Sequence, residues 1–183
     1  MHRAPLLELL ARYREGPRIT EQERAPLDRL EAFVRREPAC FERSTVEGHI
    51  TGSAWILSHD GAACLLTHHK KLGLWLQPGG HADGDADVLA VALKEGREES
   101  GIAELEALSP EIFDVDVHEI PARKGEPAHL HYDVRFALVA PAGAEFVVSE
   151  ESHDLAWVPR AEVAHYNTDD SVLRMAAKWD TRT

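Results

Sequence analysis

The segment that decides the fold is residues 78–102, PGGHADGDADVLAVALKEGREESGI. It opens with a Pro-Gly-Gly turn whose backbone groups can approach a ligand closely, because glycine has no side chain. Residues 87–100 then carry apolar side chains at helical spacing, and Gly101 stands just past their end. We therefore expect a loop that runs into a helix, with Asp85 or Asp87 as the helix cap.

Three acids share one face of this expected helix. Glu95, Glu98 and Glu99 stand at i, i+3 and i+4, so their carboxylates emerge within about one turn. They occupy the last turns, where the helix dipole disfavours negative charge by roughly 0.3–1 kcal/mol each. A bound divalent cation would offset this cost, and hard oxygen ligands favour Mg²⁺ or Mn²⁺. Taken alone, the same spacing also fits a solvated acidic face.

The residues around the acids make the pattern more specific. The segment resembles the Nudix box, G-x5-E-x7-R-E-U-x-E-E-x-G-U, in which U is an aliphatic residue. Gly80 matches the opening glycine, the three acids match the metal-binding acids of the box, and Gly101 and Ile102 match its end. The resemblance implies a Nudix-type hydrolase of pyrophosphate bonds.

Three positions depart from the box. Ala86 replaces its first glutamate, Lys94 its arginine and Gly96 its aliphatic residue. In the family that glutamate and arginine form an ion pair that steadies the loop against the helix. Asp85 or Asp87 could reach Lys94 instead. Glycine in the middle of a helix costs up to about 1 kcal/mol relative to alanine.

The resemblance covers roughly residues 48–179. Residues 74–80, LWLQPGG, resemble the W-x-x-P-G-G segment that many members place at the start of the box. Glu151 lies six residues before Trp157 and resembles a late loop acid that often precedes a tryptophan in this fold. The implied architecture is a Nudix-type α/β/α sandwich with a mixed β-sheet.

The rest of the chain agrees with an α/β, or α+β, fold. Two amphipathic stripes, with Thr20 and Glu23 as a capping box, predict an N-terminal helical extension over residues 1–45. Residues 46–183 would form the Nudix hydrolase domain. From Gly48 the spacing of the apolar residues changes to that of strands. We expect strands near residues 49–58, 63–67, 75–76, 113–120, 130–139 and 155–158, and a last helix near 170–179.

The resemblance also assigns chemical roles. Glu95 and Glu99 would hold the principal Mg²⁺ (or Mn²⁺), Glu98 would complete its shell or hold a second ion, and the Gly80 carbonyl is a further ligand. Glu151 is our candidate for the general base, with Glu95 as the competing assignment. We expect Gly79, His81 and Lys70 to contact the substrate.

Histidine is frequent, at 11 residues. His81 follows the glycine turn, and His129 and His131 alternate on one expected strand, so they share a face. Such residues could contact phosphate or serve as extra metal ligands. The alternative is surface or hydrogen-bonded histidine.

Composition limits the partners. The net charge of −12 supplies no basic footprint for a nucleic-acid backbone, so we expect a small phosphorylated metabolite or nucleotide derivative and no DNA. We see no basic leader and no apolar stretch approaching about 18 residues, which predicts a cytoplasmic protein without a membrane partner. The helical N-terminus offers an apolar face for a homodimer.

Two alternatives stay open. A non-catalytic Nudix-like module that binds a nucleotide would explain Ala86, Lys94 and Gly96. An isopentenyl-diphosphate-type isomerase shares the fold and places a Gly-His pair near a metal bound by several histidines, which Gly80 and His81 resemble. However, this chain has no cysteine beside that pair.

Overall fold

A computed structural model describes residues 2–70, 72–122, 125, 127–149 and 152–179. The helices are α1 (Ala4–Glu15), α2 (Glu21–Arg36), α3 (Val88–Ser100), α4 (Asp170–Lys178) and the 3₁₀ helix η1 (Arg160–His165). The strands are β1 (Gly48–Leu57), β2 (Ala63–His69), β3 (Trp75–Leu76), β4 (Gly79–His81), β5 (Glu106–Ala107), β6 (Asp114–Ile120), β7 (His129–Val139) and β8 (Ser152–Pro159).

These eight strands form one mixed sheet. Its main path runs β3-β2-β1-β7-β5, and β4, β6 and β8 pair with β1, β7 and β2. The long β1–β7 pair is parallel, whereas the other pairs are antiparallel. The expected mixed sheet with flanking helices is confirmed.

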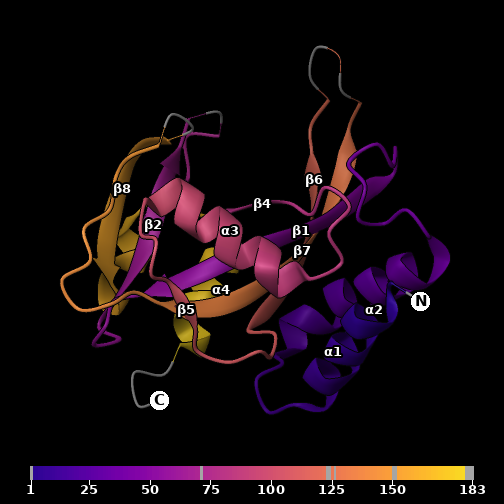
Figure 1. Cartoon of the computed structure of the whole chain (residues 1–183), viewed down its shortest axis with the longest axis horizontal. Coiled ribbons are helices and arrows are strands. Elements are labelled where there is room, and N and C mark those ends of the chain that lie inside the picture. Colours follow the sequence, from indigo (N-terminus) through magenta and orange to yellow (C-terminus); the bar gives the residue numbers. More distant parts are fainter. Residues whose placement is uncertain (1, 71, 123–124, 126, 150–151, 180–183) are drawn as a thin grey trace.

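The two faces of β1 meet different layers. Ile50, Ala54 and Ile56 belong to the core cluster that includes residues of α1, α2 and α3, whereas Trp55 and Leu57 belong to the cluster that includes α4. This alternation follows from the two-residue period of a strand. In Figure 1, α3 crosses in front of the sheet, α4 lies behind it, and α1 and α2 lie together at one end.

Two glycines let α3 lie close to the sheet. A Cβ on Gly52 of β1 would lie 2.9 Å from the Val88 carbonyl oxygen of α3. A Cβ on Gly96 of α3 would lie 3.1 Å from the Ala54 Cβ and 3.3 Å from a Leu138 methyl group. The interior glycine that seemed only to weaken the helix therefore has a packing role, because a larger side chain would crowd the sheet.

The N-terminal helices form as expected. The Thr20 amide donates to the Glu23 carboxylate at 2.9 Å and the Thr20 side chain accepts from the Glu23 backbone, which is the predicted capping box. Phe33 of α2 stacks on Tyr132 of β7 with ring centroids 4.0 Å apart. The apolar face of these helices is thus used within the chain. The homodimer and the division of the chain at residue 45 stay predictions.

Some elements were not anticipated. The Pro-Gly-Gly turn continues as β4, which pairs with β1, and neither β5 nor η1 was expected. β4 has three residues and β5 has two, so each is too short to show the two-residue period of a strand. Among the described residues, no helix is long and apolar enough to cross a membrane.

Candidate active site

Helix α3 begins and ends at the expected residues. The Asp87 carboxylate accepts a hydrogen bond from the Ala90 amide at 3.1 Å, so Asp87 and not Asp85 is the cap. Gly101 ends the helix at φ 72°, a left-handed conformation that favours glycine. These two ends fix the length of the helix that carries the three acids.

The glycine turn lies against two of the three acids. The Gly79 amide donates to Glu99 Oε1 at 2.9 Å. A Cβ on Gly80 would lie 2.4 Å from Glu95 Oε2, so the backbone of β4 lies directly on that carboxylate. Glu98 is more open, with 61% of its side chain exposed against 16% for Glu95. The structure thus brings Gly79, Gly80, Glu95 and Glu99 together.

Lys94 does not play the part that the sequence suggested. Its ammonium lies 3.0 Å from Glu95 Oε1 and 3.7 Å from Glu98 Oε2, whereas Asp87 caps the helix and Asp85 accepts from the Asp87 amide. Among the described residues, no contact joins Lys94 to Asp85 or Asp87, so that expectation is wrong. Lys94 instead partly neutralises the acid cluster, and these carboxylates raise its pKa.

A residue outside the box holds the loop between β4 and α3. Arg43 donates through Nε and Nη2 to the two oxygens of Asp83 at 2.6 and 2.9 Å. The Gly84 amide also donates to the Phe41 carbonyl at 2.9 Å. Asp83 has φ 49°, and the hydrogen bond from Arg43 lowers the pKa of its carboxyl. The segment before β1 therefore restrains the loop that Ala86 cannot steady.

The face of the sheet opposite α3 carries rows of polar side chains. Directly paired residues point to the same face. One row is His118, His131 and His49, the next is Asp116, Asp133, Thr51 and His81, and the third is Asp114, Arg135, Ser53 and Gly79. The face thus changes from histidine to carboxylate and arginine along the strands.

Asp133 and Arg135 are the centre of a buried ionic network. Asp133 Oδ1 accepts from Thr51 and Ser53 at 2.8 Å, and its Oδ2 accepts from Arg135 Nε at 2.7 Å. Burial disfavours the charge of Arg135, but the carboxylates of Asp133, Asp114 and Asp116 outweigh it and raise the pKa of the guanidinium. A paired set of this kind keeps its charge without water.

The network continues to both ends of the described chain. Asp114 accepts from Arg174 at 2.8 Å and from Lys178 at 3.0 Å. Lys178 also donates to Glu23 at 2.7 Å and to Tyr13 at 2.7 Å. α1, α2, β6 and α4 are therefore joined by one set of buried charges.

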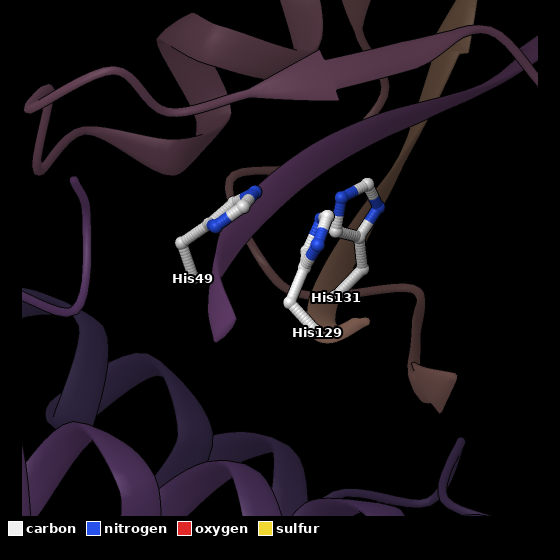
Figure 2. Close-up of side chains that lie close together, drawn as sticks. All are labelled: His49, His129 and His131. Atoms are coloured by element: carbon white, nitrogen blue, oxygen red, sulfur yellow. The ribbon is translucent and has the colours of Figure 1, made fainter. Parts of the chain in front are cut away.

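Histidines gather at the other end of the same face. The ring of His49 lies 5.1 Å from His129, 5.0 Å from His131 and 4.9 Å from His81, measured between centroids. Figure 2 shows the His49 ring pointing toward the adjacent rings of His129 and His131. Candidate ligand atoms of these three residues all lie within 4.8 Å of one another.

The rings of His49 and His131 are neutral at neutral pH. Burial and neighbouring positive groups lower the pKa of His49 to about 4, and burial with the surrounding histidines lowers that of His131 to about 2. Both ring nitrogens of His49 and the Nε2 of His131 are buried without a hydrogen-bond partner among the described residues. An unpartnered buried polar group costs about 1–3 kcal/mol.

The predicted substrate residues have separate locations. Gly79 lies against Glu99, but His81 points to the histidine face, where Arg43 Nη2 lies 2.9 Å from its Nδ1. Lys70 is exposed in the turn after β2. Glu151, the predicted base, lies outside the described residues. Sequence reasoning missed Arg43 and the Asp133–Arg135 pair, although the HxHxDxR alternation at residues 129–135 marked a polar face.

Comparison with known families agrees with this arrangement. The family model of the NUDIX domain matches residues 49–177, which include β1, the glycine turn and α3. The chain therefore belongs to the NUDIX domain family. Membership confirms the expected class of enzyme, a Nudix-type pyrophosphohydrolase. No curated protein matches the chain in sequence.

Solved structures show the same fold. A Nudix hydrolase from M. smegmatis, RenU, has a TM-score of 0.53 and 20% identity, covering 72% of this chain and 83% of that one. A C. elegans Ap4A hydrolase binary complex gives 0.57 and 17%, covering 70% and 93%. The E. coli dihydroneopterin triphosphate pyrophosphohydrolase gives 0.52 and 17%, covering 69% and 90%. At such identities the likeness establishes the fold alone.

Proposed function

We propose that this protein is a Mg²⁺- or Mn²⁺-dependent hydrolase that cleaves the pyrophosphate bond of a nucleoside diphosphate linked to another group. The observation that carries this proposal is the contact of the Gly79–Gly80 backbone with Glu99 and Glu95. A carboxylate cluster against a side-chain-free strand leaves room for phosphate oxygens beside the ion. Family membership supports the bond type.

The donor set suits a hard divalent cation. Glu95, Glu98 and Glu99 offer carboxylate oxygens from consecutive turns of α3, and the Gly80 carbonyl is a further oxygen in the proposal. Lys94 would be released from Glu95 and Glu98 when an ion takes its place. A bound divalent ion would neutralise the charge that develops on the phosphates.

The chain's own groups would do the rest. The Gly79 amide holds the Glu99 carboxylate in one orientation, which fixes an oxygen for the ion before substrate arrives. The Arg43–Asp83 pair restrains the loop over which the substrate would lie. A carboxylate must then take the proton of the attacking water, and Glu151 and Glu95 are the two candidates.

The names of the similar structures and the charge of the chain bear on the substrate. The similar structures are named for Ap4A and dihydroneopterin triphosphate hydrolysis, and both of those compounds contain a polyphosphate joined to a ring system. The net charge of −12 disfavours long nucleic acids as substrates. Within the proposal, Gly79 and Lys70 contact the phosphates beside the acids of α3, and His81 contacts a part of the substrate that reaches the other side of β4.

A panel of dinucleoside polyphosphates, nucleotide sugars and nucleoside triphosphates tests the function. Phosphate or nucleotide release should require Mg²⁺ or Mn²⁺, and Glu99→Gln should lose it. Glu104→Gln removes the same charge at an exposed position just beyond α3 and should keep wild-type turnover. Folded wild-type protein that binds Mg²⁺ yet turns over no compound would favour the non-catalytic nucleotide-binding module.

The identity of the base needs a separate comparison. Glu151→Gln should lower kcat by roughly 10²–10⁴-fold and leave Mg²⁺ binding unchanged. Glu95→Gln should weaken Mg²⁺ binding as well. If Glu151→Gln keeps its kcat while Glu95→Gln loses activity with metal still bound, the base is Glu95.

The thiols give no support to the isomerase alternative. Cys64 lies on β2 and donates to the Val158 carbonyl at 3.6 Å, and Cys40 is buried in the main core. Burial raises their pKa values to about 12 and about 11. Both thiols therefore stay protonated and enclosed, and neither is placed to carry a proton to a substrate.

A further inference from the structure

The histidine cluster of His49, His129 and His131 could hold a metal ion at a place separate from the acids of α3. His49 comes from the start of β1, and His129 and His131 come from β7, its parallel neighbour. Their candidate ligand atoms lie within 4.8 Å of one another, so small rotations of the rings could place three nitrogens around one ion. Two packed strands hold these positions, which is a firmer base than a loop.

One ring is already oriented as a ligand. His129 Nδ1 lies 3.0 Å from the Pro127 carbonyl oxygen, which can only accept a hydrogen bond, so Nδ1 carries the proton. In the neutral form of the ring, the lone pair that can bind a metal is then on Nε2. Histidines that bind metals commonly donate their other ring nitrogen to a backbone carbonyl in this way.

A second ring is buried with nothing to bind. His49 is 3% exposed, and both of its nitrogens have no partner among the described residues. His131 Nε2 is in the same position. A folded chain rarely leaves three buried nitrogens without partners. The rings of His129 and His131 face His49 across the gap, so one ion would bind one nitrogen from each of the three residues (Figure 2).

We propose that His49, His129 and His131 bind a divalent transition-metal ion of the Zn²⁺ class. Imidazole nitrogens suit Zn²⁺, Cu²⁺, Fe²⁺ and Ni²⁺, whereas Mg²⁺ prefers oxygen. Three protein ligands leave a fourth position for water or an anionic oxygen, as in zinc sites that bind substrates. His81 borders this position and is held by Arg43.

The site is separate from the acids of α3. Gly80 faces Glu95, and the next residue, His81, faces the histidines, because successive residues of a strand point to opposite sides. The two sites therefore lie on opposite sides of β4 and differ in ligand chemistry. Each should bind its own ion when the other site has been disabled.

Zn²⁺ titration calorimetry in excess Mg²⁺ tests the proposal. Wild-type protein should bind Zn²⁺ at one site, and His129→Gln and His131→Gln should each weaken binding by at least about tenfold. His59→Gln, the same change at an exposed turn residue, should bind as the wild type does. Circular dichroism confirms that each variant is folded, and the partly exposed His129 tolerates the change even if His131 does not.

Co²⁺ in place of Zn²⁺ identifies the ligands. A four-coordinate Co²⁺ ion bound by nitrogen gives visible absorption bands that six-coordinate, all-oxygen Co²⁺ gives only weakly. These bands should persist in Glu99→Gln and disappear in His131→Gln. The proposal is wrong if wild-type protein binds no Zn²⁺ in excess Mg²⁺, if the histidine variants bind it unchanged, or if Glu99→Gln abolishes it.

Discussion

Replacing Gly80 by alanine should disable the proposed metal site without unfolding the protein. The new Cβ would lie 2.4 Å from Glu95 Oε2 and 2.5 Å from its carboxyl carbon, whereas ordinary contact begins at 3.4 Å. The carboxylate must therefore move by about 1 Å, and a misplacement of that size costs about a hundredfold in rate. This loss corresponds to about 2.7 kcal/mol of transition-state stabilisation.

Stability should change little. The crowded atoms are the far end of the flexible Glu95 side chain, which can rotate away, and β4 has no left-handed residue at this position. We expect the free energy of unfolding to change by less than about 1 kcal/mol. The assays are kcat/KM on the best substrate of the panel, Mg²⁺ affinity, and urea unfolding.

Gly61→Ala is the matched control. Gly61 has φ 67°, and its added Cβ would meet no described atom within 4 Å. Alanine in that conformation should cost about 1–2 kcal/mol of stability and leave kcat unchanged. The two variants should therefore show opposite patterns. A Gly80→Ala protein with wild-type kcat/KM would refute the reasoning that this turn sets the position of Glu95.

Three further predictions follow from the packing and the charges. Arg43→Lys should raise KM by roughly two- to fivefold with a smaller effect on unfolding, because lysine cannot form the two-point contact with Asp83 and the pair is exposed; steady-state kinetics would measure it. Gly52→Ala should lower the free energy of unfolding by about 1–3 kcal/mol, as α3 is pushed from the sheet; urea titration tests this. The ionised Glu23 carboxylate, with all of its partners, should contribute about 3 kcal/mol at neutral pH, because the pKa of Glu23 falls from 4.5 to about 2 on folding. That contribution should be lost between about pH 4.5 and pH 2, and Glu23→Gln should remove this part of the pH dependence of unfolding.

Each of these three predictions would be contradicted by a different result. The Arg43 result is contradicted if Arg43→Lys keeps the wild-type KM. An unchanged urea midpoint for Gly52→Ala would contradict the close packing of α3 on β1. The sign of the Glu23 effect follows from its causes: burial raises the pKa, but hydrogen bonds from Lys178, Tyr13 and Thr20 outweigh burial, so the folded state binds the proton less tightly. Equal stability losses in wild type and Glu23→Gln below pH 4.5 would contradict it.

The local structure could be predicted well from the sequence. The cap at Asp87, the left-handed Gly101 and the capping box at Thr20 form as expected, because each depends on residues within a few positions of one another. The helix that carries the acids and the glycine turn beside it also form as expected, because both lie in one segment, whereas the roles of these residues at a metal stay predictions. Local patterns of this kind can be read without a fold.

The missed features are those that join distant segments. Arg43 and Asp83 are 40 residues apart, and His49 meets His131 only because β1 and β7 pair in parallel. Gly96 was expected to weaken a helix, since its contact with Ala54 is not visible in the spacing of the chain. The position of Glu151 relative to the acids stays a prediction.

The buried ammonium of Lys178 has a consequence for folding during synthesis. Lys178 is synthesised 155 residues after Glu23 and 64 residues after Asp114. Until α4 is complete, Glu23 lacks its ammonium partner and gains nothing from leaving water, and Asp114 has only Arg135 among its described cationic partners. Contacts of such sequence separation slow folding. The last helix should therefore act as the closing step, after which the early helices and the sheet become one cooperative unit.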